Sequence, residues 1–462
     1  MVTGRGRTRG ANATVRKGSW ISQPLTVLSL FLALVFFTGG SSWGHEGQLI
    51  VLRPVAVLVA AWGLYRMEPR HWRDYRIAWA LFAGAALLPV LHLVPLPFAW
   101  WSQLPGRELI AQIDAATGLG QLSRPLSMHP DATINALVSM AVPLAALSLA
   151  VQLDEMARRR LAAVVLALIG VSALVGLVQL SGAELSFYRA VPDTHPSGLF
   201  ANRNHQAALL ALALPLAALA WRGGYGWGLG ARTERFGAAA LVLLILPLVV
   251  VTGSRGGLLA TGAGLLCTVA MLSGANRRSG SRLKAAGTLL IALAVVAGLV
   301  ALTIYAARDE AINRMAGSGE DLRYPVWESI LSAIPAYWPW GTGVGSYVAA
   351  YKVLEPAALL RPTFSNHAHN EWLEVAFTAG LPGVVLLALS ALALAVATVR
   401  AWHAGSVAGI FQRIGVSMII VLAIASSADY PLRTPILSAL LMIAATWATR
   451  EGANLPRRAS HV

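Results

Sequence analysis

Long apolar runs separated by short basic clusters constrain this chain more than any other feature. A helix of about 20 apolar residues crosses about 30 Å of hydrocarbon, and lipid admits only backbone whose hydrogen bonds are satisfied internally. The composition agrees, because 56% of the 462 residues are hydrophobic and 12% are charged, against roughly 25% charged in soluble domains. We therefore predict an all-α integral membrane protein.

The apolar runs predict twelve transmembrane helices. The first run, from Pro24 to Thr38, is followed almost at once by a second and has no clear small-x-small cleavage site, so we interpret it as a helix and not as a signal peptide. The predicted helices lie at about 24–38, 48–65, 77–94, 133–152, 161–180, 205–221, 237–253, 256–273, 285–306, 376–399, 414–428 and 434–449.

Basic residues indicate how these helices are oriented. With the N-terminus inside, the loops on one face and the two tails hold 24 of the 36 Lys and Arg residues, and the positive-inside rule makes this face cytoplasmic. The net charge of +15 is therefore a topology signal, and we expect no nucleic-acid partner. The single cysteine, Cys267, lies in an apolar run, which excludes a disulfide and a cysteine zinc site.

The expected organisation has one large interruption. It consists of a basic tail over 1–23, nine helices within 24–306, a large outer loop over 307–372, three helices within 373–449 and a tail over 450–462. The outer face also receives the segments near 95–131, 181–205, 253–256 and 429–433, and we expect the chemistry on this face.

Three arginines on the outer face are candidates for binding a phosphate group. Arg255 lies between two apolar runs in a glycine-rich turn, Arg323 follows two acidic residues, and Arg203 lies in a polar segment. Each has an ordinary alternative: Arg255 could be a snorkelling arginine, Arg323 part of a surface ion pair, and Arg203 a solvated loop residue. Together they place three guanidinium groups on one face, and guanidinium matches phosphate oxygens in a bidentate manner.

Two histidines in the large loop are the candidates for acid–base chemistry. His367 and His369, with Glu371, alternate along the chain and admit a metal pair, but His-x-His without a further histidine or cysteine at typical spacing is a weak zinc signal. A solvated loop histidine is one alternative, and a general base is the other.

At these residues the sequence resembles the O-antigen ligase and polysaccharide polymerase superfamily, over roughly residues 195–385. Five stretches carry the resemblance, in order and all on the expected outer face: Gly198-Leu199-Phe200-Ala201-Asn202-Arg203-Asn204-His205, Thr252-Gly253-Ser254-Arg255-Gly256-Gly257, Arg323-Tyr324-Pro325-Val326-Trp327, the turn over 339–345, and His369-Asn370-Glu371-Trp372-Leu373 followed by Gly380-Leu381-Pro382-Gly383.

The resemblance implies a GT-C-like membrane glycosyltransferase of the bacterial inner membrane, with both termini cytoplasmic and the active site facing the periplasm. Such enzymes take a glycan from an undecaprenyl pyrophosphate carrier, pass it to an acceptor hydroxyl with inversion, and need neither metal nor cofactor. By position in the motifs, Arg255 and Arg323 resemble the arginines that bind pyrophosphate, and His369 resembles the catalytic histidine. Arg203 is a third donor-binding candidate, although that motif often has proline there. Supporting roles fall to Asn202, Asn204, His367, Asn370 and Glu371.

Several functions remain open at this point, and we favour an O-antigen ligase over an O-antigen or exopolysaccharide polymerase. A ligase would deliver a glycan to lipid A core, a polymerase would extend a growing glycan on the carrier, and a protein glycosyltransferase would modify a protein. A transporter or flippase is the alternative of a different class, but it is expected to carry ionisable groups near the bilayer midplane. Arg53 is the single basic residue inside a predicted helix, which favours an enzyme that acts on lipid-linked glycans.

Overall fold

The computed structural model describes residues 24–273, 323–403 and 409–450, apart from 45, 121, 184, 189–194 and 361–363, together with residues 294, 298 and 301. Within this part of the chain nearly all regular structure is helical. Two short strands, β1 (Pro95–Leu96) and β2 (Arg124–Pro125), form an antiparallel pair in which Pro95 lies opposite Pro125.

The helices follow in this order: α1 (Pro24–Thr38), α2 (Leu49–Tyr65), α3 (Pro69–Asp74), α4 (Arg76–His92), α5 (Phe98–Trp101), α6 (Glu108–Ala116), α7 (Pro130–Ser139), α8 (Ala141–Ala150), α9 (Glu155–Leu180), α10 (Arg203–Ala217) with the 3₁₀ turn η2 (Ala218–Trp221), α11 (Ala231–Val251), α12 (Arg255–Ser273), α14 (Arg323–Tyr337), α15 (Tyr347–Leu354), η4 (Ala357–Leu359), α16 (Glu371–His403), α17 (Ile410–Ser426), η5 (Pro431–Arg433) and α18 (Pro435–Thr449).

Within the described residues, each apolar run that was predicted to be a transmembrane helix forms a helix or a pair of helices. The run predicted at 133–152 forms two helices, α7 and α8, that meet at Met140. The helix predicted at 285–306 lies almost wholly outside the described residues. Among the described helices, six are long and apolar enough to cross a membrane, and five further apolar helices have 10–17 residues. The structure thus agrees with a helical membrane protein, whereas twelve crossings and a GT-C arrangement stay predictions.

Helix α10 lies at the centre of the bundle. It packs against α9, α11, α12 and α17, and together with η2 it is almost entirely buried. Every residue from His205 to Ala217 is buried, and the alternation of alanine and leucine in this stretch lets neighbouring helices approach closely. Because α10 begins at Arg203, its buried body fixes the polar residues of its first turn in place.

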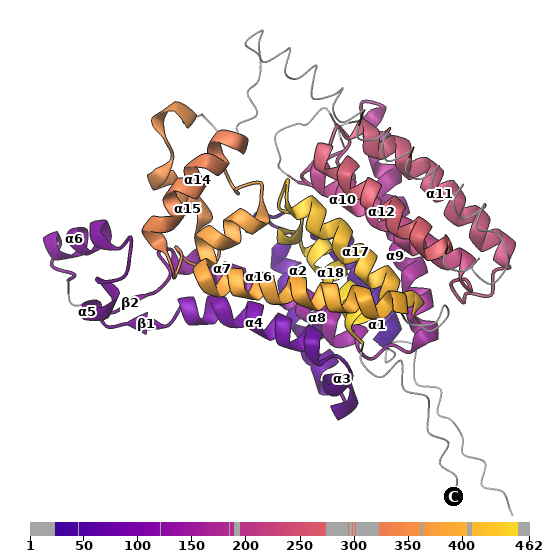
Figure 1. The fold of residues 1–462 in the computed structure, drawn as a ribbon, viewed down its shortest axis with the longest axis horizontal. Helices are drawn as coiled ribbons and strands as arrows, with labels where there is room; N and C mark the ends of the chain where they lie inside the picture. Colours follow the sequence, from indigo (N-terminus) through magenta and orange to yellow (C-terminus); the bar gives the residue numbers. More distant parts are fainter. Residues whose placement is uncertain are drawn as a thin grey trace, which may run out of the picture.

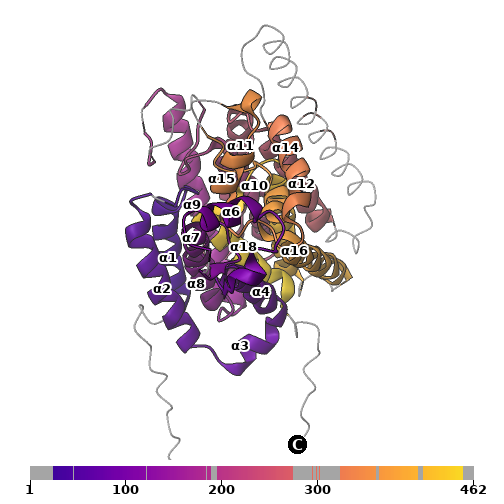
Figure 2. The ribbon, with the colours of Figure 1, turned by 90° about the vertical axis from the view of Figure 1, so that its left-hand side faces the viewer.

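The segment predicted to be a large outer loop contains helices of its own within its described residues. Its apolar residues fall at helical spacing in α14, with Ile330 and Tyr337 buried, and α15 follows after a glycine-rich turn. Figures 1 and 2 both show α14 and α15 at one end of the molecule and α3 at the opposite end. The helices of this segment therefore lie at the end of the molecule opposite α3.

The glycine-rich turn over 339–345 docks onto a break in α16. Gly380 there has φ 59° and ψ −149°, a conformation that is essentially restricted to glycine. The freed backbone groups pair with the turn, since Leu381 N donates to Pro339 O at 2.8 Å and Gly343 N donates to Thr378 O at 2.8 Å. This contact fixes the outer loop relative to the first two turns of α16.

We predict that Gly380→Ala lowers the free energy of unfolding by more than the cost of placing alanine in this backbone conformation. A Cβ on Gly380 would lie 2.1 Å from Pro339 O, so the turn must shift, in addition to about 1–3 kcal/mol for the backbone. Gly118→Ala is the matched control, because Gly118 has φ 78° and nothing within 4 Å of its Cβ position. Thermal unfolding of both variants in detergent measures the difference, and equal melting temperatures would contradict the prediction.

Candidate functional site

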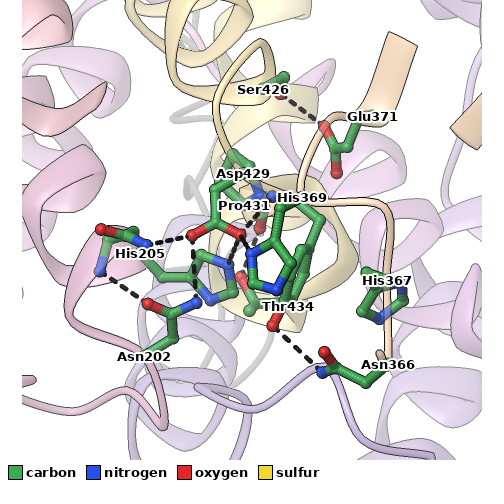
Figure 3. A network of polar contacts seen from close by, with 12 residues as sticks. Asn202, His205, Asn366, His367, His369, Glu371, Ser426, Asp429, Pro431 and Thr434 are labelled. Carbon is green, nitrogen blue, oxygen red and sulfur yellow. Dashed lines mark hydrogen bonds and ion pairs between the residues drawn. The ribbon is translucent and has the colours of Figure 1, made fainter. Parts of the chain in front are cut away.

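A buried carboxylate, Asp429, lies at the centre of the polar network in Figure 3. It is 3% exposed and lies between α17 and η5. Asn202 Nδ2 donates to Asp429 Oδ2 at 3.1 Å, Asn204 Nδ2 donates to the same oxygen, and Tyr430 N donates to Oδ1 at 2.9 Å. A buried carboxylate needs such donors, because an unpaired charge is strongly disfavoured away from water.

The two asparagines reach Asp429 because they open α10. Asn202 is the N-cap of α10, and its side-chain oxygen accepts from Asn204 N at 2.8 Å, which leaves its amide nitrogen to bind Asp429. The Asn-x-Asn spacing thus serves the helix cap and the carboxylate at once. Both residues were predicted to support the site, and both lie on it.

His369 binds the other side of the carboxylate. Its Nδ1 lies 3.1 Å from Asp429 Oδ1, so Nδ1–H donates to the carboxylate and Nε2 carries the lone pair that accepts a proton. The His369 side chain is 29% exposed, against 5% for Asp429, which leaves the imidazole accessible from outside. Among the described residues, His369 is the single non-glycine residue with a positive φ, at 49°. Such strain is found where surrounding contacts hold a residue in a functional position.

A second carboxylate, Glu374, holds the backbone and side chain before His369. Glu374 lies 1% exposed and accepts from Ala368 N at 3.1 Å, while His367 Nδ1 lies 3.1 Å from Oε1 and Arg433 Nη2 lies 3.3 Å from it. Trp327 Nε1 donates to Ala368 O at 2.7 Å. These contacts over-determine the conformation of the loop and supply the constraint that the strained His369 requires.

The ring of Tyr430 packs against three histidine rings of the cluster. Its ring lies 4.9 Å from that of His369, 4.2 Å from that of His367 and 4.9 Å from that of His205, measured between centroids. The His205 ring is 1% exposed, and neither of its nitrogens has a hydrogen-bond partner in the described part of the chain. Its Nε2 lies 3.9 Å from Asp429 Oδ1, on the same oxygen that His369 contacts.

A pocket opens beside this cluster. Its wall combines Asp429 and Asn204 with Arg323, the first residue of α14, and with Gly256 and Gly257 in the first turn of α12. The first N–H groups of a helix have no intrahelical partner and favour anions, as does a guanidinium group. In α12 one of these groups, Gly257 N, is capped by Ser254 Oγ at 3.0 Å. The pocket therefore combines a cationic side chain and a helix N-terminus with the neighbouring imidazole.

The three predicted arginines lie in different places around the pocket. Arg323 forms part of its wall, and its charge acts on Asp429. Arg255 begins α12 between the wall residues Ser254 and Gly256 but is not itself among the wall residues. Arg203 lies against the turn before α12, since a Cβ on Gly253 would be 3.5 Å from its Nη1. The structure thus gathers all three at one end of the bundle, with Arg323 directly in the pocket.

The remaining predicted residues have local partners. Asn370 Oδ1 accepts from Leu373 N at 3.2 Å, which caps α16, and His367 faces Glu374. Glu371 is buried and its Oε2 accepts from Ser426 Oγ, so it joins α16 to α17 (Figure 3). None of these three side chains contacts Asp429 within the described contacts, in contrast to Asn202, Asn204 and His369.

Sequence reasoning missed the residues that organise the site, namely Asp429, Tyr430, Glu374 and Arg433. One signal was available for three of them, because the short outer segment 429–433 places a carboxylate, a tyrosine and an arginine between two apolar helices. What the sequence does not show is that this segment meets a loop some 60 residues earlier and a helix start more than 200 residues earlier.

Asp429 is held in its charged form. Burial raises the pKa of its carboxyl, but the interaction with the His369 imidazole, which includes the Nδ1–H hydrogen bond, and the charge of Arg323 outweigh burial and bring the pKa well below its usual value of 3.8. A carboxyl with a depressed pKa contributes stability above its unfolded pKa, and loses that contribution as pH falls through the folded pKa.

We therefore predict a pH-dependent loss of stability in Asp429→Asn. The variant should unfold more easily than wild type by about 1–3 kcal/mol between pH 5 and pH 8, because a charged hydrogen-bond acceptor is lost. The difference in unfolding free energy between wild type and variant should narrow below about pH 4. In that range the carboxyl is protonated in the unfolded protein, so ionised Asp429 stabilises the folded state less. Thermal unfolding in detergent from pH 8 to pH 3 measures this, with the exposed Asp131→Asn as control. A gap that does not depend on pH would contradict the prediction.

No group of three or more His, Cys, Asp or Glu side chains among the described residues is arranged to hold a metal ion. The carboxylates of Asp429 and Glu374 are instead engaged by side-chain and backbone donors of the cluster. The arrangement can hold an anion next to a histidine whose free nitrogen can accept a proton.

Fold and site together define a helical protein of membrane character with a pocket lined by Arg323 and Asp429, and a carboxylate-paired histidine beside it. Residues 239–388, about a third of the chain, match the family model described as O-antigen ligase. Over this segment the chain is related to the O-antigen ligases, as its motifs suggested, and Arg255, Arg323 and His369 all lie within it. The stretch 198–205 lies outside the match. No curated protein matches the chain.

Proposed function

We propose that this protein is a membrane glycosyltransferase that moves a glycan from undecaprenyl pyrophosphate to an acceptor hydroxyl, most simply in O-antigen ligation to lipid A core. One observation carries the proposal: His369 is paired with Asp429 at 3.1 Å, beside a pocket whose wall contains Arg323 and the first turn of α12. The match to O-antigen ligases over 239–388 supports a ligase or polymerase type of membrane enzyme.

In the proposed reaction the acceptor oxygen attacks the anomeric carbon of the donor sugar while the bond from that carbon to the phosphate oxygen breaks. The acceptor proton passes to His369 Nε2, and undecaprenyl pyrophosphate leaves with the bonding electron pair. Single displacement inverts the anomeric centre. Asp429 holds the imidazole in the tautomer that accepts at Nε2 and stabilises the imidazolium that forms.

The leaving diphosphate gains negative charge as the bond breaks. Arg323 is a fixed donor toward that charge, and fixed donors away from bulk water stabilise a transition state without reorganisation. The positive end of the α12 helix dipole adds to this charge stabilisation, while Gly257 N itself donates to Ser254 Oγ at 3.0 Å. Arg255 and Arg203, at the two helix starts next to the pocket, are proposed to hold the other phosphate oxygens. Asn202 and Asn204 act through Asp429, whereas His367, Asn370 and Glu371 position the loop.

The proposal places the protein in the inner membrane with both termini cytoplasmic and the pocket facing the periplasm, where a lipid-linked glycan and its acceptor meet. The excess of Lys and Arg on the opposite face supports this orientation. The reaction as proposed needs no metal and no cofactor, because arginines and a histidine supply the charge and the base.

A deletion strain tests the function. Lipopolysaccharide is profiled on gels and the lipid-linked glycan pool is measured, with complementation by wild type and by His369→Ala. Long glycans accumulating on the carrier beside bare lipid A core would support a ligase. Single repeat units accumulating on the carrier would assign a polymerase instead, and no change in either pool would exclude both and favour transport.

A further inference from the structure

The chain between α4 and α7 projects from the rest of the molecule. Residues 95–125, which we call the outer hairpin, contain the paired strands β1 and β2 with α5 and α6 between them. Figure 1 shows this segment beyond the end of α4. The described residues of the outer hairpin expose large apolar side chains, each 43–69% exposed, namely Trp100, Leu109, Ile113, Leu119 and Leu122. Exposed apolar side chains gathered on one segment mark a contact surface.

The charged side chains of the outer hairpin are turned inward. Arg107 is fully buried, and its Nη2 donates to Leu126 O at 2.8 Å. Asp114 is also buried, and its two oxygens accept from Nε and Nη2 of Arg124. Among the described charged residues of the hairpin, Glu108 alone is exposed. Paired charges inside and apolar groups outside are the arrangement that lipid favours, because lipid does not solvate a charge.

Helix α6 shows this reversal most clearly. Its inward face runs from the N-cap, Arg107, to the buried Asp114 two turns later. Leu109 and Ile113 are four residues apart and therefore share another face of the helix, on which both side chains are more than half exposed. A surface helix in water normally turns its apolar face to the core and its charges outward. The face that carries Leu109 and Ile113 therefore indicates an apolar neighbour.

The exposed apolar surface continues from α4, which identifies this neighbour. Leu87 and Leu91, near the end of α4, and Val94, directly before the hairpin, are 45–52% exposed. Helix α4 is one of the apolar helices of the bundle, and it packs against α7, α16 and α18. Trp100 follows in α5, and tryptophan is enriched where hydrocarbon meets water. An apolar surface that is continuous with a membrane-type helix favours lipid over a protein partner.

The outer hairpin is also fixed to the turn over 339–345. Arg107 Nη2 donates to Gly341 O at 3.0 Å, in addition to its bond within the hairpin. Met128 N, shortly after the hairpin, donates to Thr342 O at 2.9 Å. Because the same turn docks onto the break in α16, the hairpin, the turn and α16 form one connected unit.

We propose that the outer hairpin lies on the outer-face surface of the lipid bilayer, with Trp100, Leu109 and Ile113 in contact with phospholipid, and that this contact anchors the turn over 339–345. The exposed face of α6 is then covered as in other helices that lie in the membrane interface. The inference rests on the membrane character of the bundle. It does not depend on glycan transfer, so it fails or holds separately from the proposed function.

A fluorescent label measures the position of α6 relative to lipid. Full-length protein with Ile113→Cys is labelled and placed in nanodiscs of phosphatidylethanolamine and phosphatidylglycerol, with or without brominated acyl chains. Brominated lipid should quench this label, and iodide in the buffer should not. Ala115→Cys is the matched control, because Ala115 is exposed and two residues turn a helix by about 200°. Its label should respond to iodide and not to brominated lipid. Wild type, with the single cysteine Cys267 in α12, gives the background labelling.

Two results of the label experiment would overturn the proposal. Equal quenching of both labels by iodide would mean that the outer hairpin is surrounded by water. Shielding of the label at position 113 from both quenchers would mean that protein, such as a second copy of the chain, covers this face of α6.

Hydrogen exchange in the same nanodiscs tests the anchoring of the turn. The double change Leu109→Asp with Ile113→Asp should raise the exchange rate of the Thr342 and Gly343 amides about tenfold, the effect of losing about 1.4 kcal/mol of apolar burial. Ala115→Asp adds the same charge on another face and should leave both rates unchanged. Equal rates in wild type and the double variant would overturn the anchoring. A rise that includes the amides of α10 would reflect general unfolding, and the label experiment then decides.

Discussion

Replacing His369 with alanine is expected to lower the rate of glycan transfer by about 10²–10⁴-fold, the range that a positioned general base contributes. The His369 imidazole is hydrogen-bonded to a carboxylate and, unlike the buried His205, is partly exposed, and alanine leaves the acceptor proton without a base. Initial rates with reconstituted protein measure the effect. The KM for the donor should stay close to wild type, because His369 is not part of the pocket wall.

His403→Ala is the control, because His403 is the last residue of α16, the helix that follows His369, and its Nδ1 lies 2.9 Å from Val399 O. This variant should transfer glycan at the wild-type rate. Full activity in His369→Ala would show that His369 is not the general base. A loss accompanied by a much lower melting temperature would instead assign it a structural role.

Replacing Arg323 with alanine is expected to lower kcat by about 10²–10³-fold, as the loss of one fixed donor to a developing charge does elsewhere. The guanidinium lies on the pocket wall at the start of α14, where it faces the site proposed for the diphosphate. Arg323→Lys should recover only part of the rate, because an ammonium lacks the planar fork that binds two oxygens. The same assay at saturating donor measures both variants.

Arg255→Ala is expected to show a loss of the same kind, and Arg400→Ala, at the far end of α16, should show none. If Arg323→Ala raised only the donor KM and left kcat unchanged, Arg323 would bind the ground state and the transition state equally. If Arg323→Ala were fully active while Arg255→Ala was not, the diphosphate would lie on the turn before α12 and not in the pocket described here.

The helices were largely predictable because each apolar run is long and bounded by charged or glycine-rich residues. The boundaries were less so. Asn202 starts α10 earlier than the apolar residues alone indicate, because its side chain caps the helix. The break at Met140 has no counterpart in hydropathy, since both flanking helices are apolar. Periodicity reports apolar faces and not the exact path of the backbone between them.

Some residues of the candidate site were predictable because they lie in recognisable sequence motifs, and others were not. His369, Asn202 and Asn204 stand in motifs that the sequence displays directly, whereas Asp429 stands alone between two apolar helices. Its role depends on tertiary contacts with residues about 60 and 225 positions away in the chain, which no local pattern encodes. An acidic residue in a very short outer connection was the single hint available.

The most direct measurement of the central claim is glycan transfer by the purified protein, reconstituted alone with an undecaprenyl pyrophosphate-linked glycan and rough lipopolysaccharide. The proposal predicts that wild type forms glycan-modified lipid A core and releases undecaprenyl pyrophosphate in equal amounts, and that His369→Ala forms neither at a comparable rate. Consumption of donor with no modified acceptor, or equal transfer by both proteins, would contradict it.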